Sequence, residues 1–81
     1  MSAKLFKLVI SAIDAPLYNG EASSAVIPGE EGQMTVLAHH EPLITRLKEG
    51  TIVVHDVHGT HEFNITSGVV EIAHNTVTVL L

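Results

Sequence analysis

Hydrophobic residues recur at every second position along much of this chain, and no segment repeats them with the 3.6-residue period of a helix. The first such segment is residues 4–11 (KLFKLVIS), in which Phe6, Leu8 and Ile10 would share one face. Alternate side chains of a strand point to opposite faces of its sheet, so this pattern predicts a half-buried strand. Several short strands of this kind, separated by turn residues, indicate an all-β sandwich or flattened barrel.

Turn-forming residues divide the next part of the chain. Pro16 and the Asn19-Gly20 pair predict a turn after the first strand, because proline fixes φ and the pair tolerates positive φ. Residues 21–29 (EASSAVIPG) and 33–38 (QMTVLA) are then predicted to form two strands on either side of an acidic turn. The sequence thus predicts three strands before its midpoint.

The second half of the chain predicts two β-hairpins. In the first, a two-residue loop at His58-Gly59 would place Val54 opposite Phe63 and Ile52 opposite Ile65. In the second, a loop at His74-Asn75 would bring four apolar residues to one face, namely Val70, Ile72, Val77 and Val79. Both hairpins are therefore expected to contribute an apolar face to the core.

The composition fits one small domain that spans residues 1–81 and is held together by burial alone. Hydrophobic residues make up 46% of the chain, mostly Val, Ile and Leu, and there is no cysteine to form a disulfide. So much apolar surface in so small a domain suggests that a partner covers one face.

The charge and the amino terminus restrict the possible partners. Nine acidic and four basic residues give a formal net charge of −5, which disfavours nucleic acid because phosphate neutralisation dominates that affinity. No apolar run approaches the ~18 residues that a membrane helix needs, and the first residues do not resemble a signal peptide. We therefore expect a cytosolic, peripheral protein that binds no nucleic acid and does not insert into lipid.

Six histidines raise the possibility of a metal site, and His55, His58 and His61 follow one another at a spacing of three. In the predicted hairpin His55 and His61 point to opposite faces and His58 lies in the loop, so the three cannot surround one ion. Cross-strand pairs are the favoured interpretation. The expected pairs are His55 with Glu62 and Asp56 with His61.

Residues 39–50 (HHEPLITRLKEG) contain Pro42 and no clean period of two, which predicts an irregular connection with one short strand. On a strand, the adjacent His39 and His40 would face opposite ways, so only one could bind a metal from a given side. A small metal-dependent enzyme that uses His40 with His55 or His58 nevertheless stays open as an alternative.

Other catalytic patterns are absent from the sequence. No serine lies in a G-x-S-x-G elbow, and the glycines of PGEEG lack the lysine and hydroxyl residue of a phosphate-binding loop. The adjacent Glu30 and Glu31 are expected to be solvated turn carboxylates rather than a general acid and base. We therefore predict no catalytic residue, no cofactor and no metal ligand.

Four ordered motifs resemble the amino-terminal β-sandwich domain of the ε subunit of F-type ATP synthases, which is called δ in mitochondria. They are EGQMTV at residues 31–36, HEPLIT at 40–45, KEGTI at 48–52 and SGVVE at 67–71, within a likeness that runs from about Lys4 to Leu80. The resemblance implies a sandwich of about ten strands and a non-catalytic rotor subunit of the central stalk. Such a subunit joins the γ subunit to the membrane c-ring and couples proton flow to ATP synthesis or hydrolysis.

The resemblance also implies contact residues and a location. Toward the c-ring it implies Glu31, Gly32, Gln33, Met34 and Thr35. Toward γ it implies Ser11, His40, Pro42 and Thr45. The expected location is the cytoplasmic face of the bacterial inner membrane, as a peripheral part of the complex.

Two departures from the family limit what the resemblance implies. The family usually continues into a helical hairpin that can inhibit ATP hydrolysis or bind ATP, whereas this sequence ends at Leu81, so neither property is carried over. Thr35 and Ala38 stand where many relatives have glycine, which leaves the local loop shape open. A free-standing β-sandwich adaptor with other partners remains a further alternative.

Overall fold

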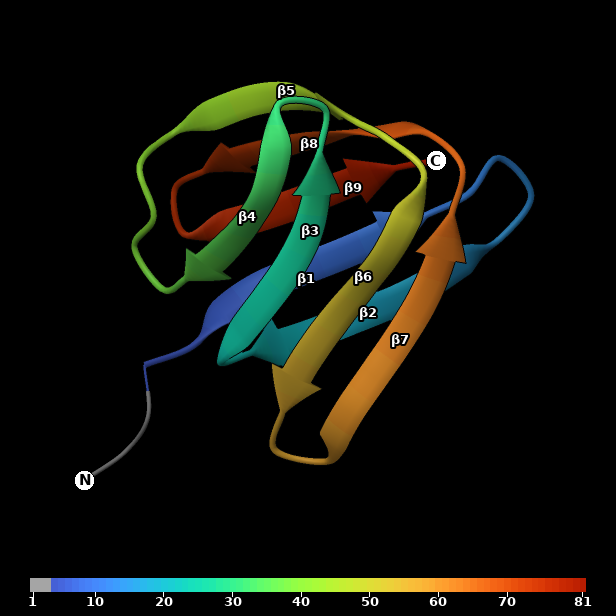
Figure 1. The fold of residues 1–81 in the computed structure, drawn as a ribbon. Coiled ribbons are helices and arrows are strands. Elements are labelled where there is room, and N and C mark those ends of the chain that lie inside the picture. The colour runs from blue at the N-terminus through green and yellow to red at the C-terminus, as the bar shows by residue number, and fades with distance from the viewer. Residues whose placement is uncertain (1–3) are drawn as a thin grey trace.

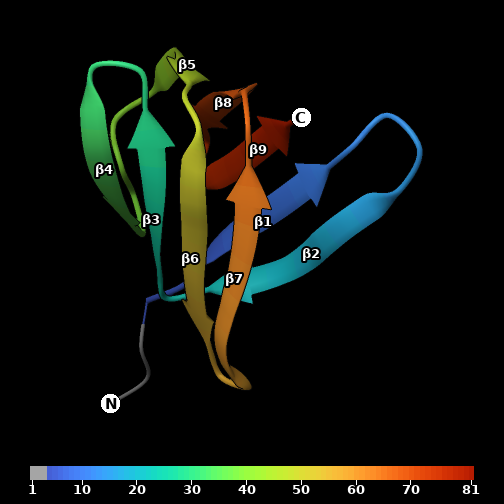
Figure 2. The ribbon, with the colours of Figure 1, turned by 45° about the vertical axis from the view of Figure 1, so that its right-hand side comes forward.

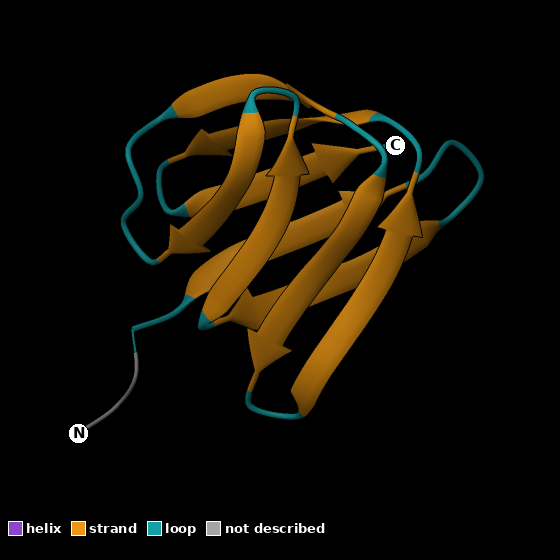
Figure 3. Cartoon of the chain, viewed as in Figure 1, coloured by secondary structure: helices purple, strands orange, loops and turns teal. Residues whose placement is uncertain are grey.

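The computed structural model describes residues 4–81, which form nine β-strands and no helix (Figures 1 and 3). The strands are β1 (Phe6–Ser11), β2 (Pro16–Ala22), β3 (Ser24–Gly29), β4 (Gly32–Leu37), β5 (Leu43–Leu47), β6 (Gly50–Asp56), β7 (Gly59–Ile65), β8 (Gly68–Ala73) and β9 (Thr76–Leu80). The predicted all-β fold is confirmed, with nine strands in this range where about ten were implied. None of these residues forms a helix long and apolar enough to cross a membrane.

The strands form two layers that face each other (Figure 2). One layer has the order β2-β1-β9-β8-β5, and the other has the order β4-β3-β6-β7. The two layers are continuous at one edge, where Gly29 of β3 pairs with Leu47 of β5. At the opposite edges, β2 and β7 each have one paired neighbour, so the sandwich is not closed there by a sheet ladder.

The core lies between the layers and follows the period-two pattern. Phe6, Leu8 and Ile10 are almost fully buried, as predicted, and so are the inward residues of the β8–β9 hairpin. The core comprises Phe6, Leu8, Ile10, Ala22, Ala25, Ile27, Val36, Leu47, Ile52, Val54, Ile65, Val70, Ile72, Val77 and Val79. Close packing of branched side chains makes such an interior stiff, because small shifts of volume cost free energy.

The β8–β9 hairpin has the predicted register. Ile72 lies opposite Val77 and Val70 lies opposite Val79. His74 and Asn75 form the loop with φ of 52° and 58°, the left-handed conformation that a two-residue hairpin turn requires. Asparagine adopts this conformation more readily than most residues, which is why the sequence signal was reliable here.

The β6–β7 hairpin differs from the predicted register by two residues. The loop is Val57-His58 rather than His58-Gly59, so Asp56 pairs with Gly59 and Val54 lies opposite His61. The physical reason is a turn with aspartate in its first position and glycine in its fourth, in which Asp56 Oδ1 accepts a 2.8 Å hydrogen bond from the His58 amide. A shift of two residues leaves every side chain on its predicted face.

The prediction of a turn at Pro16 and Asn19-Gly20 was wrong, because these residues belong to β2. The turn lies just before them, where the Ala12 amide donates a 2.9 Å hydrogen bond to the Ala15 carbonyl. Pro16 begins an edge strand, a position that needs no ladder donor. The predicted strand at residues 21–29 is accordingly divided at Ser23 between β2 and β3.

The histidine pair at residues 39 and 40 lies in the predicted irregular connection and not on a strand. His39 lies in a turn after β4 with φ of 64°, and His40 follows it in the connection to β5. The His39 amide donates a 2.7 Å hydrogen bond to Asn75 Oδ1, and Asn75 Nδ2 donates one of 2.9 Å to the Leu5 carbonyl. Asn75 thus ties the β4–β5 connection to the start of β1, while the single short strand predicted in residues 39–50 is confirmed as β5.

Candidate functional site

The β3–β4 turn owes its shape to two glycines. Gly29 pairs with Gly32, which leaves Glu30 and Glu31 as the two exposed central residues. Gly32 has a φ of +147°, and a Cβ on Gly29 would lie 2.7 Å from the Gly32 carbonyl oxygen. Both positions therefore require glycine, so the sequence itself dictates the form of this turn.

The base of this turn is held by β5. The Glu30 amide donates a 2.9 Å hydrogen bond to the Arg46 carbonyl, and the Lys48 amide donates one of 3.0 Å to the Pro28 carbonyl. These two hydrogen bonds flank the pairing of Gly29 with Leu47, which joins the two layers. The turn is consequently a projection of the rigid sandwich rather than a free loop.

A hollow of about 280 Å³ lies beside the turn and brings together most of the residues expected on the ring side. Glu31, Gly32, Gln33 and Met34 line it, and Met34 is half-buried against the core. Thr35 is exposed and does not line the hollow, since it alternates with the inward-facing Met34 and Val36 along β4.

The four residues expected toward γ do not form one patch. Thr45 lines the same hollow as Met34, because it faces inward on β5 opposite the buried Val70. Ser11 lies at the end of β1, opposite Leu80 of β9. His40 and exposed Pro42 lie in the β4–β5 connection, which Asn75 ties to the beginning of β1.

The structure reveals an apolar outer face that the prediction of specific contacts missed. On the five-stranded layer, Val69 lies opposite Leu80, and Leu80 lies opposite Ser11 on the next strand. Ile44 of β5 and Leu17 of β2 extend this face on its two sides, and the exposed Glu71 and Arg46 lie within it, opposite Ile44 and Val69. The exposed fractions are 69% for Ile44, 57% for Leu80, 44% for Leu17 and 39% for Val69.

A signal for this face was present in the sequence. Val69-Val70 and Leu80-Leu81 each place two apolar residues in succession, so strand alternation must expose one member of the pair. The high apolar content had suggested a covered face, but it could not say which strands contribute to it. We name Leu17, Ile44, Val69 and Leu80, together with Ser11, the outer apolar face.

The histidines of the β6–β7 hairpin form a polar cluster rather than a metal site. His55 and His61 lie on opposite faces as predicted. The predicted pair of His55 with Glu62 was wrong, because His55 lies opposite Thr60. The predicted pair of His61 with Asp56 is confirmed as a contact, although His61 lies opposite Val54. His55 Nδ1 is 3.0 Å from Thr60 Oγ1. His61 still contacts Asp56 diagonally, with 3.0 Å between its Nε2 and Asp56 Oδ2.

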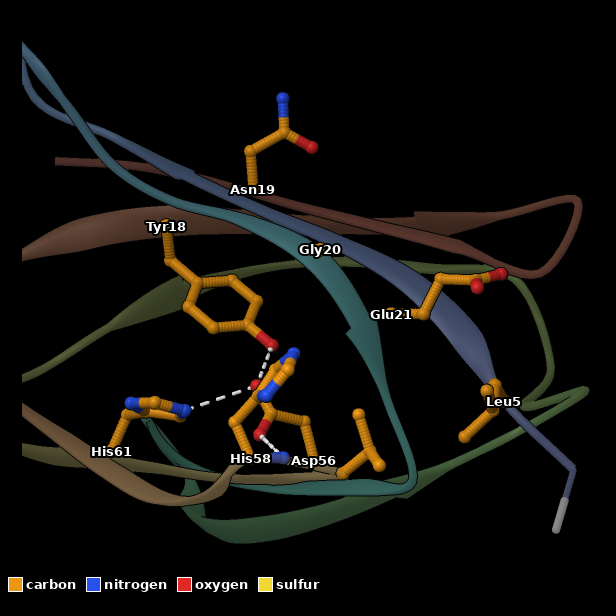
Figure 4. Close-up of a pocket in the computed structure, with 9 residues that line it drawn as sticks. Leu5, Tyr18, Asn19, Gly20, Glu21, Asp56, His58 and His61 are labelled. Atoms are coloured by element: carbon orange, nitrogen blue, oxygen red, sulfur yellow. Dashed lines mark hydrogen bonds and ion pairs between the residues drawn. The ribbon is translucent and has the colours of Figure 1, made fainter.

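Asp56 joins this cluster to the other layer. The Tyr18 hydroxyl of β2 donates a 2.6 Å hydrogen bond to Asp56 Oδ2 (Figure 4). This hydrogen bond, more than the His58 amide and His61, lowers the pKa of Asp56 to about 2 against the opposing effect of burial. The pKa of Tyr18 is raised to about 12, mainly by burial and secondly by the hydrogen bond to Asp56.

The described residues contain no group of three or more His, Asp or Glu side chains placed to hold a metal ion. His40 lies in the β4–β5 connection, whereas His55 and His58 lie on the β6–β7 hairpin, so the residues proposed for a metal-dependent enzyme come from separate parts of the fold. The described residues therefore do not bring together the ligands that the metal-dependent alternative needs.

Comparison with known proteins identifies one sequence family. A family described as the beta-sandwich domain of the ATP synthase delta/epsilon chain matches residues 5–81. The ATP synthase epsilon chain 2 of Burkholderia orbicola is 37% identical over 76 residues, covering 91% of this chain and 50% of that protein. The epsilon chain of Xanthomonas oryzae pv. oryzae is 39% identical over 74 residues, covering 90% of this chain and 52% of that protein. The chain thus spans about half the length of the curated relatives it matches.

Solved structures share the fold at lower sequence identity. A chain in the cryo-EM structure of the Euglena gracilis mitochondrial ATP synthase (OSCP, F1 and c-ring) matches with a TM-score of 0.84 and 24% identity, covering 99% of this chain and 51% of that one. A chain in the central stalk and c-ring structure of the Tetrahymena thermophila mitochondrial ATP synthase matches with a TM-score of 0.78 and 15% identity, covering 91% and 60%. These likenesses extend over nearly the whole sandwich.

Proposed function

Because the chain belongs to the family of ATP synthase delta/epsilon β-sandwich domains, we propose that it is a non-catalytic part of the central rotor of an F-type ATP synthase. In this role it joins the γ subunit to the c-ring and couples ion flow to ATP synthesis or hydrolysis. The observation that carries the proposal is a stiff sandwich with an exposed apolar face and an anchored turn, in a chain whose relatives are epsilon chains.

The outer apolar face is the surface that we assign to γ. Ser11, which the resemblance implies on the γ side, lies within it, opposite Leu80. Burial of a large aliphatic side chain contributes about 1.5–3 kcal/mol, and these side chains are still partly in water. His40 and Pro42 would contact γ from the β4–β5 connection, outside this face.

The β3–β4 turn is the surface that we assign to the c-ring. Glu31, Gly32, Gln33, Met34 and Thr35 supply its contacts, and Thr45 belongs with them because it lines the same hollow. The two exposed turn carboxylates favour a polar or basic partner surface. Hydrogen bonds from β5 at the base of the turn support its use as a load-bearing contact.

Mechanical coupling requires stiffness rather than reactive groups. A closely packed core resists deformation, so a displacement applied at one surface is transmitted to the other. We therefore assign no active site and no cofactor to this chain. ATP synthases are membrane-bound, and we propose a peripheral position on the cytoplasmic face of the bacterial inner membrane through these protein contacts.

Co-purification tests the assembly. A tagged chain expressed in its own cells should retrieve both γ and c-ring subunits. Retrieval of neither would refute the rotor assignment, and retrieval of other proteins alone would support a free-standing adaptor.

A substitution in the turn tests the coupling function. Thr35→Glu adds a charge at an exposed position and should lower ATP-driven proton pumping per ATP hydrolysed in reconstituted membranes, with the thermal stability of the isolated chain unchanged. Met34→Glu is less suitable, since Met34 packs against the core. The matched control is Thr66→Glu, an exposed threonine between β7 and β8. If Thr35→Glu leaves the number of protons pumped per ATP unchanged, the turn does not contact the c-ring.

A further inference from the structure

A second and larger hollow lies away from both surfaces, between edge strand β2 and the tip of the β6–β7 hairpin (Figure 4). Its volume is about 570 Å³, within the range of sites that take a small molecule or a large side chain. It occupies the edge at which no ladder closes the sandwich. Neither the outer apolar face nor the β3–β4 turn contributes to its lining.

The Asp56 carboxylate is the charge at the base of this hollow. Its side chain is only 6% exposed, and it receives hydrogen bonds from the Tyr18 hydroxyl and from the His58 amide. The pKa of about 2 keeps Asp56 ionised throughout the physiological range. A carboxylate has about four lone-pair positions, so Oδ1, which accepts only the His58 amide, can accept a further donor.

Among residues 4–81, no permanent cation lies beside this charge. No lysine or arginine lines the hollow, and the ion pair that Asp56 forms within residues 4–81 is with His61. His61 Nε2 lies 3.0 Å from Asp56 Oδ2, and the imidazole is a cation only when it is protonated. Glu21 adds a second carboxylate at the rim. Two carboxylates in a hollow without lysine or arginine are complementary to a cation from outside the chain.

The remaining lining is apolar and aromatic. Leu5 and Val57 stand at the rim with 36% and 86% of their surface exposed. The Tyr18 ring borders the hollow and is supported by Phe63, whose ring centroid lies 6.1 Å away in an edge-to-face arrangement. An occupant that fits must therefore have an apolar stem and a cationic end.

From this combination we propose that the hollow receives an arginine side chain of a partner protein. Its aliphatic stem would lie along Leu5 and Val57, and its guanidinium would reach Asp56 Oδ1 and the Tyr18 hydroxyl oxygen. A planar guanidinium presents donors to two acceptors at once and stacks on an aromatic ring, whereas a lysine ammonium is a single, strongly hydrated point charge. The site would add a polar, orientation-setting contact to whichever partner covers this edge.

A titration of the 81-residue chain with N-acetyl-arginine amide, followed by amide NMR shifts, tests the proposal. Saturable shifts should appear at Tyr18, Gly20, Val57 and His61 and not at the β3–β4 turn. N-acetyl-citrulline amide has the same shape without the charge and should bind at least about tenfold more weakly. N-acetyl-lysine amide should fall between the two.

Variants separate the binding site from the fold. Asp56→Asn should weaken arginine binding at least about tenfold, and Glu21→Gln, an exposed rim position, should weaken it about twofold to fivefold. Glu49→Gln, an exposed acid outside the hollow, is the control and should bind as the unaltered chain does. Equal binding of arginine and citrulline, or no saturable shift, would overturn the proposal and leave His61 as the counter-ion of Asp56. Because the probe is a free amino-acid derivative, this outcome is independent of the rotor assignment.

Discussion

Replacing Ile44 by threonine should weaken γ binding by an amount that follows from its exposure. Full burial of such a side chain contributes about 1.5–3 kcal/mol, and 69% of Ile44 remains exposed in the free chain. Covering that fraction supplies about 1–2 kcal/mol, which corresponds to about a five- to thirtyfold change in Kd. Threonine retains the β-branched shape that strands favour, so the free chain should keep its stability.

Leu80 provides an independent measurement on the same face. With 57% of Leu80 exposed, Leu80→Thr should weaken binding by about four- to eighteenfold. Ile44 and Leu80 lie on strands separated by β8, so their effects should combine nearly additively in the double variant. The double variant would then bind about 20- to 500-fold more weakly.

Titration calorimetry with purified γ measures these changes directly. Leu37→Thr is the matched control, because Leu37 is 55% exposed but lies on β4 in the other layer, and it should change Kd less than about twofold. Urea unfolding should give the same midpoint for every variant. If Ile44→Thr and Leu80→Thr bind γ as tightly as Leu37→Thr does, the outer apolar face is not the γ surface.

Four further predictions concern the sandwich itself. Asn75→Gly should lose the two hydrogen bonds of the side chain and with them about 1–3 kcal/mol of unfolding free energy. Asn75→Ala should lose about 1–2 kcal/mol more, because alanine is strained at the φ of 58° that this position adopts. Equal stabilities of the two variants in urea would contradict this. Ultraviolet absorbance should show that Tyr18, the single tyrosine, ionises with a pKa of about 12 in the folded chain. Its contribution to stability is therefore complete below its ordinary pKa of 10.0 and is lost as pH rises toward 12. Because the pKa of Asp56 is lowered, the stability gap between the unaltered chain and Asp56→Asn should be constant above the ordinary pKa of 3.8 and shrink as pH falls toward 2; a gap independent of pH would refute the pairing. Hydrogen exchange of the Glu30 and Lys48 amides should be as slow as that of core strands, and exchange as fast as at exposed Thr66 would mean that the turn is mobile.

The face of the sheet on which each side chain lies was easier to predict than the residue that it pairs with on the neighbouring strand. The inward positions of β1 and of the β8–β9 hairpin follow from alternation alone, since burial of one face selects the register. In the β6–β7 hairpin the His58-Gly59 loop competed with a turn that begins at Asp56, and both keep the same faces inward. Alternation could not distinguish them, because they differ by two residues. The side-chain bond from Asp56 to the His58 amide decides between them.

Local turn propensity was overridden where a strand lies at a sheet edge. Pro16 and Asn19-Gly20 are strong turn signals, yet β2 pairs with β1 along this stretch. Gly20 has a different purpose there: a Cβ at this position would lie 3.3 Å from the Tyr18 hydroxyl oxygen, so glycine leaves room for that side chain. The bond between Tyr18 and Asp56 joins residues 38 positions apart, a distance that no local pattern reports.

The short strand β5 connects the two proposed contact surfaces. Its outward residue Ile44 belongs to the outer apolar face, and its inward residue Thr45 lines the hollow beside the β3–β4 turn. Leu47 pairs with Gly29 where the two layers meet, and the Arg46 carbonyl accepts the Glu30 amide of the turn. A force applied at the turn therefore reaches the outer face through five residues of one extended strand, without passing through a flexible loop. Because a strand resists extension through its covalent backbone and β5 is also paired with β8, this route is stiff. The part of the chain that the sequence predicted to be an irregular connection with one short strand thus contains the element on which the proposed coupling role depends most.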